Sequence, residues 1–187
     1  MFQSRWLVAG LTVALAGMVA PLSAQSSLTP DVVGGVLLKV LSYDRALARN
    51  GAGDVVVGVV FDPSEPKSAR AREAVGGAMR NVSTIAGRGV RILDVEVSKL
   101  QEALKAQRVM ALYVTPGLDR ELSDIVTAAD RGGITTLGET RSYARRGVAV
   151  AVDNYGGRPA LFINLPAARR EGADLPSSVL ALATVIQ

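Results

Sequence analysis

The chain has 187 residues, of which 49% are hydrophobic and 4% are aromatic. This length suits one domain and is too short for two domains of ordinary size. The sequence contains no cysteine and no histidine, which excludes disulfides, thiolate nucleophiles, Cys/His zinc sites, His-ligated haem and the Ser-His-Asp triad. The net charge of +4 is mild. Because aromatic residues that could stack on bases are scarce, nucleic-acid binding is not favoured.

The beginning of the chain has the pattern of a secretory signal peptide. Arg5 supplies a positive charge, residues 7–19 are apolar, and a small residue, Ala24, provides a cleavage site. The apolar stretch is shorter than the roughly 20 residues that a membrane-spanning helix needs. We therefore expect a signal peptide over residues 1–24, a single α/β domain over residues 25–187, and a periplasmic mature protein.

A helix is predicted to follow the signal peptide. Residues 29–31, Thr-Pro-Asp, are typical of a helix start, and Asn50-Gly51 is typical of a helix end. The polar residues Tyr43, Asp44 and Arg45 interrupt the apolar stripe of this helix, either as a solvated face with a local ion pair or as a recognition surface. The stripe itself consists of Val32, Val33, Val36, Leu37, Val40, Leu41 and Leu47.

The middle of the chain alternates between predicted strands and helices. The continuous apolar run Val55–Phe61 indicates a strand that is buried on both faces, as in a parallel sheet. Further strands are predicted over residues 90–97, 109–114 and 134–137, and Ser68 is expected to cap the first of the intervening helices. This alternation is typical of parallel βαβ units with right-handed crossovers.

A β-hairpin is predicted near the end of the chain. In residues 148–152 valine alternates with alanine, residues 160–165 form the return strand, and Gly156-Gly157 accept positive φ in the turn. Together with the preceding alternation, this predicts an α/β fold: a three-layer domain with a mostly parallel sheet, a C-terminal antiparallel hairpin and an extra N-terminal helix.

Two helices are predicted after the hairpin. Asn164 or Leu165 is expected to cap a short helix, and Pro176 to open a last one. The pattern predicts that Phe162, in the return strand, and Leu182, in the last helix, are both buried. The apolar stripe of the last helix consists of Val179, Leu180, Leu182, Ala183 and Ile186.

Polar residues follow the predicted strands, at the edge where open parallel sheets bind ligands. They suit either a small-molecule crevice or ordinary turns and helix caps. The sequence has no dinucleotide-binding or phosphate-binding glycine loop after the first strand. The acids and lysines show no pattern that would shift their pKa values, so we expect no catalytic residue, no metal ligand and no cofactor. The strand-end residues are Asp62, Ser64, Ser98, Thr115, Glu139, Thr140 and Arg141.

Basic residues outnumber acidic ones after residue 134. Arg145, Arg146 and Arg169 lie outside the apolar pattern of the elements that contain them. They form either a solvated face or a surface for an acidic protein partner or an anionic membrane.

Four segments of the last third of the chain form one pattern: Tyr-Ala-Arg-Arg-Gly at residues 143–147, Leu-Phe-Ile-Asn-Leu at 161–165, Ala-Ala-Arg-Arg at 167–170, and Ser-Ser-Val-Leu-Ala-Leu-Ala at 177–183. In this pattern the chain resembles the YfiR-type family of exported bacterial proteins. The N-terminal helix departs from the aromatic-rich version that is usual in the family.

The resemblance implies a small periplasmic α/β regulator that is homodimeric and not catalytic. The best-known members restrain a membrane-bound diguanylate cyclase, an enzyme of cyclic-di-GMP signalling, by binding its periplasmic part. The alternative is a periplasmic small-ligand-binding protein that resembles one lobe of a solute-binding protein. The candidate residues for contact with a membrane-anchored protein partner are Arg145, Arg146, Arg169, Tyr43, Asp44 and Arg45.

Overall fold

The computed structural model describes residues 28–49 and 53–187. The predicted signal peptide and the predicted helix end at Asn50-Gly51 lie outside these residues. No helix in the two described ranges is long and apolar enough to cross a membrane.

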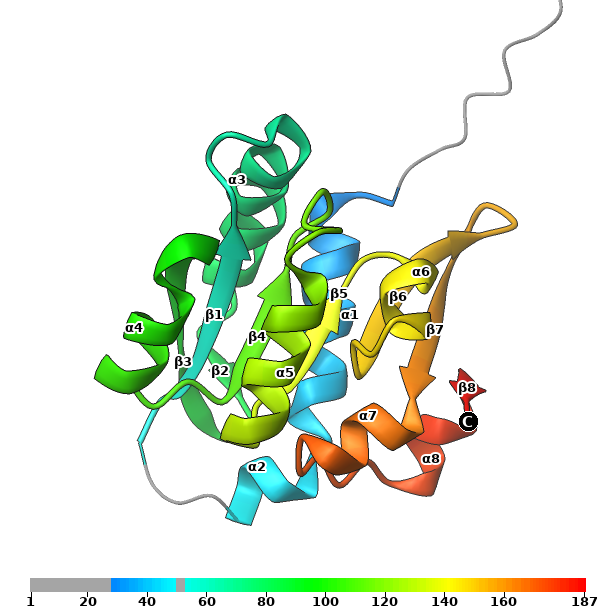
Figure 1. Ribbon diagram of the computed structural model, residues 1–187. Helices are drawn as coiled ribbons and strands as arrows, with labels where there is room; N and C mark the ends of the chain where they lie inside the picture. Colours follow the sequence, from blue (N-terminus) through cyan, green and yellow to red (C-terminus); the bar gives the residue numbers. More distant parts are fainter. Residues whose placement is uncertain (1–27, 50–52) are drawn as a thin grey trace, which may run out of the picture.

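One mixed sheet forms the centre of the molecule, and its eight strands lie in the order β2-β3-β1-β4-β5-β6-β7-β8 (Figure 1). The strands from β3 to β6 in this order are parallel, β7 pairs antiparallel with β6, and β8 pairs parallel with β7. The predicted fold class is therefore confirmed. The bounds are β1 Val55–Phe61, β2 Thr84–Ile85, β3 Arg88–Glu96, β4 Ala111–Val114, β5 Thr135–Gly138, β6 Val150–Tyr155, β7 Arg158–Asn164 and β8 Ala183–Ile186.

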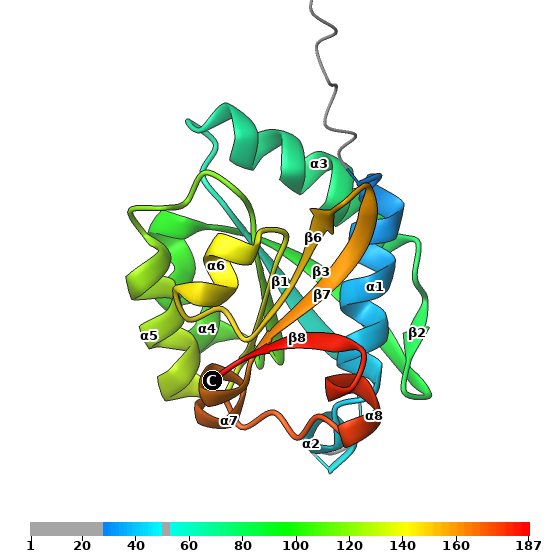
Figure 2. The same cartoon turned by 90° about the vertical axis from the view of Figure 1, so that its right-hand side faces the viewer.

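Helices cover both faces of the sheet. Helices α1 and α3 pack on one face, and α4, α5 and α6 pack on the other (Figures 1 and 2). Every residue of β1 is buried between these layers, as the continuous apolar run predicted. The bounds are α1 Pro30–Ser42, α2 Arg45–Arg49, α3 Pro66–Arg80, η1 Val97–Lys99, α4 Leu100–Ala106, α5 Leu122–Gly132, α6 Arg141–Arg145, α7 Leu165–Arg170 and α8 Ser177–Leu180.

The predicted N-terminal helix is divided into α1 and α2. Asp44, which is 4% exposed, ends the first helix and opens the second. Its Oδ1 atom accepts hydrogen bonds from the backbone N–H groups of Ala46, at 2.9 Å, and of Asp174, at 2.8 Å. An aspartate that bonds backbone groups in this way competes with helical hydrogen bonding, which explains the break.

The structure corrects the role that the sequence suggested for Ser68. Helix α3 begins at Pro66, and the side chain of Glu65 caps it by accepting from the N–H of Lys67. Ser68 lies inside the helix and is buried, where its hydroxyl bonds the Thr115 hydroxyl at 2.6 Å. Its role is thus to join α3 to the end of β4, because its hydroxyl has a buried polar partner there.

The predicted last helix is largely wrong. Helix α8 has a single turn, and the chain then enters β8, which pairs with β7 from Leu161↔Ala183 onward. Phe162 is buried as predicted, at 3% exposure, whereas Leu182 is 82% exposed. The β-branched residues 184–186 suit a strand, and pairing with β7 satisfies backbone groups that a helix would otherwise have satisfied internally.

The burial of α1 gives a test of the core. Leu37 is 0% exposed and Val32 is 37% exposed, on the same helix. We expect Leu37→Ala to lower the free energy of unfolding by about 2–5 kcal/mol, because it removes buried methyl groups and leaves a cavity. Val32→Ala should cost less than about 1 kcal/mol. Urea denaturation measures both values, and equal losses would contradict this packing of α1.

Candidate functional site

An apolar groove of about 920 Å³ lies between α1 and the last strands of the sheet. Figure 2 shows α1 beside β7, with α8 and β8 next to them. Helix α1 supplies one wall, and the hairpin, α8 and β8 supply the other. The lining residues are Gly35, Val36, Lys39, Val40, Tyr43, Val152, Pro159, Ala160, Leu161, Val179, Ala181, Leu182, Ala183 and Thr184.

Small residues contribute to both walls of the groove. On α1, a Cβ atom added to Gly35 would meet nothing within 4 Å, and the other wall includes Ala181 and Ala183. Two large apolar side chains remain in solvent at this place, Tyr43 at 46% exposure and Leu182 at 82%. Contiguous apolar surface of this kind marks interaction sites in soluble domains.

The formal charge of the groove lining comes from one side chain. Among the described residues that line the groove, Lys39 is the one charged residue. Its Nζ atom lies 4.9 Å from the centre of the Tyr43 ring, a cation–π geometry. The groove therefore presents one positive charge at the edge of an apolar surface.

The first group of predicted partner residues is split by the fold. Tyr43 lines the groove, whereas the Asp44 carboxylate is buried as the cap of α2. The side chain of Arg45 is exposed, and its backbone N–H donates to the Asp174 carbonyl at 3.0 Å. Of these three residues, the structure gives Asp44 a structural role and leaves Tyr43 and Arg45 accessible.

The second group lies on another part of the surface. Arg145 and Arg146 are exposed at the end of α6, and Arg169 is exposed in the last turn of α7. Arg146 pairs with Asp119, which neutralises part of its charge. The Asn164 side chain joins the two helices by donating to the Ala144 carbonyl at 2.8 Å. Helix α6 lies on the face of the sheet opposite α1, so Arg145 and Arg146 do not share a surface with Tyr43, whereas α7, which carries Arg169, packs into the same core as α1.

Most of the strand-end residues form hydrogen bonds to nearby groups of the fold. The Asp62 carboxylate accepts from the N–H and the hydroxyl of Ser64, which lowers the pKa of Asp62. The Tyr113 hydroxyl donates to Glu139 at 2.8 Å, and burial raises the pKa of both groups. These contacts suit turns and buried pairs, which was the second of the two interpretations drawn from the sequence.

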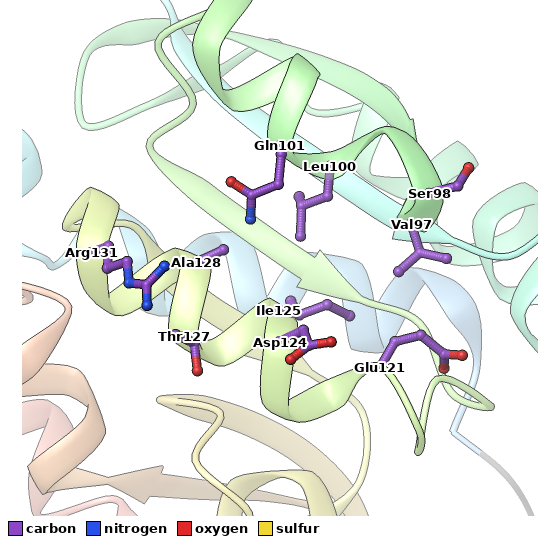
Figure 3. A pocket seen from close by; sticks show the side chains of 10 residues that line it. All are labelled: Val97, Ser98, Leu100, Gln101, Glu121, Asp124, Ile125, Thr127, Ala128 and Arg131. Atoms are coloured by element: carbon purple, nitrogen blue, oxygen red, sulfur yellow. The ribbon is translucent and has the colours of Figure 1, made fainter.

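A hollow of about 590 Å³ lies between α4 and α5 (Figure 3). Leu100 and Ile125, which are both buried, lie at its base, and acidic and basic side chains such as Asp124 and Arg131 stand around it. None of the predicted partner residues lines this hollow. Glu121 is a second acid in its lining, beside Asp124 and Arg131.

The sequence reasoning missed a buried acid, Glu171. This residue is 1% exposed, and its carboxylate accepts from the N–H and the hydroxyl of Thr136 at 2.7 and 2.6 Å. Burial raises the pKa of Glu171 to about 8, and the bonds from Thr136 oppose this shift. The expectation that no acid would have a shifted pKa was therefore wrong. Glu171 follows two arginines at the end of a helix, a pattern that usually marks a solvated turn.

Solved structures of other bacterial proteins are similar to this one. A conserved domain protein from Vibrio cholerae matches with a TM-score of 0.63 and 17% identity, over 87% of this chain and 62% of that chain. An ABC domain from Streptococcus pneumoniae, in complex with L-Trp, matches with a TM-score of 0.60 and 14% identity, over 84% and 62%. An open, ligand-free substrate binding protein with adhesive properties from Clostridium difficile matches with a TM-score of 0.52 and 11% identity, over 71% and 54%.

At these identities the likeness shows the fold alone, and the chain spans about 62% of the length of the first two proteins. Residues 65–184 match the model of the YfiR/HmsC-like family, which confirms the resemblance drawn from the sequence. A comparison with curated proteins found no match. The matched residues include the hairpin, α8 and the first half of β8, whereas α1 lies before them.

The buried acid predicts a pH dependence of stability. An unfolded glutamate has a pKa near 4.3, whereas Glu171 in the fold has a pKa of about 8. Between about pH 5 and about pH 8 the folded state holds the extra proton, so the free energy of unfolding falls as the pH rises. We expect Glu171→Gln, which is neutral at every pH, to flatten this fall.

Urea denaturation across this pH range measures the effect. Glu102→Gln, at an exposed position on α4, is the matched control and should keep the slope of the unsubstituted protein. An equal slope in all three proteins would contradict the assignment of the pH dependence to Glu171.

Proposed function

Because the chain belongs to the YfiR/HmsC-like family, we propose that it is an exported regulator that acts by binding a membrane-anchored signalling protein. In this proposal residues 1–24 direct export and are removed, and residues 25–187 form the periplasmic domain. The domain performs no catalysis. Its partner is the periplasmic part of a membrane-bound enzyme such as a diguanylate cyclase, which it restrains as a homodimer.

The apolar groove is the observation that carries this proposal. A regulator of this kind needs a surface that a protein partner can bury, and Tyr43 and Leu182 lie exposed in an apolar hollow of about 920 Å³. Aromatic residues at the centre of an interface contribute most of its binding energy. Tyr43 is therefore the residue on which we expect partner binding to depend most. Arg145, Arg146 and Arg169 provide a second, electrostatic contact away from the groove.

Two variants test the proposal against the partner recovered with the mature protein from its membrane fraction. Tyr43→Ala should weaken binding of the recovered periplasmic region about tenfold or more, as the loss of an aromatic contact at the centre of an interface does. Tyr155→Ala removes an exposed aromatic residue outside the groove and should change affinity little.

Replacing the three arginines with alanine should weaken binding at low salt and have less effect at high salt, because exposed charges are screened. Titration of each variant by calorimetry at two salt concentrations measures these changes. Unaltered affinity in both Tyr43→Ala and the triple variant would refute the proposed contact surfaces.

A second function is favoured by one observation. A similar structure is in complex with L-Trp, and another belongs to a substrate binding protein. This supports a small-ligand-binding protein, with the ligand at the carboxyl ends of the parallel strands, near the hydrogen-bonded pair of Tyr113 and Glu139.

Thermal unfolding with L-Trp and a panel of other metabolites separates the two functions. The regulator requires no ligand, so we expect a constant melting temperature across the panel. A saturable rise, which ligand binding to the folded state produces, would favour the second function. Loss of that rise in Glu139→Gln would place the ligand at the strand ends.

A further inference from the structure

Strand β8 is an unprotected edge beside the apolar groove. It pairs with β7 on one side, and no strand in residues 28–49 and 53–187 pairs with its other side. The outer N–H and C=O groups of such a strand form a template for a further strand. Proline and charged residues usually protect an edge, but β8 consists of Ala-Thr-Val-Ile. The opposite edge of the sheet is β2, which has only two residues.

The groove and the edge belong to the same surface. Ala183 and Thr184 of β8 line the groove, and Leu182, immediately before the strand, projects into solvent at 82% exposure. A segment that pairs with β8 would place alternate side chains on each face of the sheet. Those on the α1 side would extend the apolar surface of the groove. Backbone pairing supplies affinity in this mode of recognition, and the side-chain pockets supply specificity.

The charge in the groove indicates what kind of segment binds there. Lys39 is the one charged side chain among the described residues of the groove, and its positive charge favours a segment that carries a carboxylate. A second copy that docks through the same surface brings none, because neither the groove lining nor β8 contains an acidic residue. It would bring another Lys39 instead. A different protein that carries an acid within an apolar extended segment meets both requirements.

We propose that an extended apolar segment of a partner protein, with an acidic residue that reaches Lys39, adds as a strand to the outer edge of β8. Because β8 has four residues, the paired segment is short, on the order of four to six residues. The proposal rests on the proposed function, since it names the form in which the regulated partner is bound.

The first test selects short peptides from a random displayed library against the mature protein. We expect the selected peptides to alternate apolar residues with others and to contain Asp or Glu. N-methylation of alternate backbone nitrogens in the best peptide should reduce its affinity about tenfold, because it removes donors to β8. The outer amides of β8 should exchange more slowly with solvent when the peptide is bound.

Three substitutions complete the test. Lys39→Glu should weaken binding of acidic peptides, whereas Lys105→Glu, on the exposed surface of α4, should not. Leu182→Asp should weaken binding without unfolding the protein, because the side chain is 82% exposed. The proposal would be overturned if neither N-methylation nor Leu182→Asp changed the affinity. It would also be overturned if the library yielded no binding peptide.

A second copy at this edge is also a measurable outcome. If β8 amides are already protected in the free protein and Leu182→Asp converts a dimer to a monomer, the edge joins two copies and the proposal is overturned. Different outcomes refute the proposed function and the proposed strand addition. If a membrane partner binds the Leu182→Asp variant with full affinity, the proposed function stands and strand addition is refuted. Peptide binding without any membrane partner supports strand addition and refutes the function.

Discussion

The buried carboxylate of Asp44 holds together the part of the molecule on which the groove depends. Its Oδ1 atom accepts from the N–H groups of Ala46 and Asp174, while Arg45 donates its backbone N–H to the carbonyl of Asp174. Arg49 adds an ion pair to the Asp174 side chain at 2.8 Å. These contacts end α1 and fix the segment that leads into α8 and β8. The two walls of the groove, far apart in sequence, therefore meet at one buried acid.

The opposite wall depends on the width of the sheet. Helix α1 packs on the central strands and covers β6 through Val150 and Val152, but the sheet continues beyond it through β7 and β8. On the other face Ala144, Ala151 and Phe162 form a small separate core beneath α6. Because the sheet extends farther than the helix layer on the α1 side, apolar side chains at that border remain in contact with water.

This arrangement combines two parts of the chain that differ in their relation to the family. The edge formed by the hairpin, α8 and β8 lies almost wholly within the residues that match the YfiR/HmsC-like model, whereas α1, with Lys39 and Tyr43, precedes them. In the proposed function, the matched edge supplies backbone pairing and α1 supplies the aromatic and charged contacts. A change confined to α1 would then alter the choice of partner while leaving the strand edge intact.

Local patterns were enough for the central strands and their turns. The apolar run Val55–Phe61 predicted a fully buried strand, and Asn164 bonds the backbone at the start of α7 as its position before a proline suggested. Asp44, Glu171 and Leu182 were assigned incorrectly or incompletely, since their environments come from residues more than 20 positions away. The predicted last helix ends in strand β8 because β7 has backbone groups that pair with it. Glu171, in a polar turn, is buried because Thr136 of β5 packs against it. The spacing of residues within a segment does not indicate which distant residues will contact it. The effects of such contacts are therefore decided by the tertiary structure.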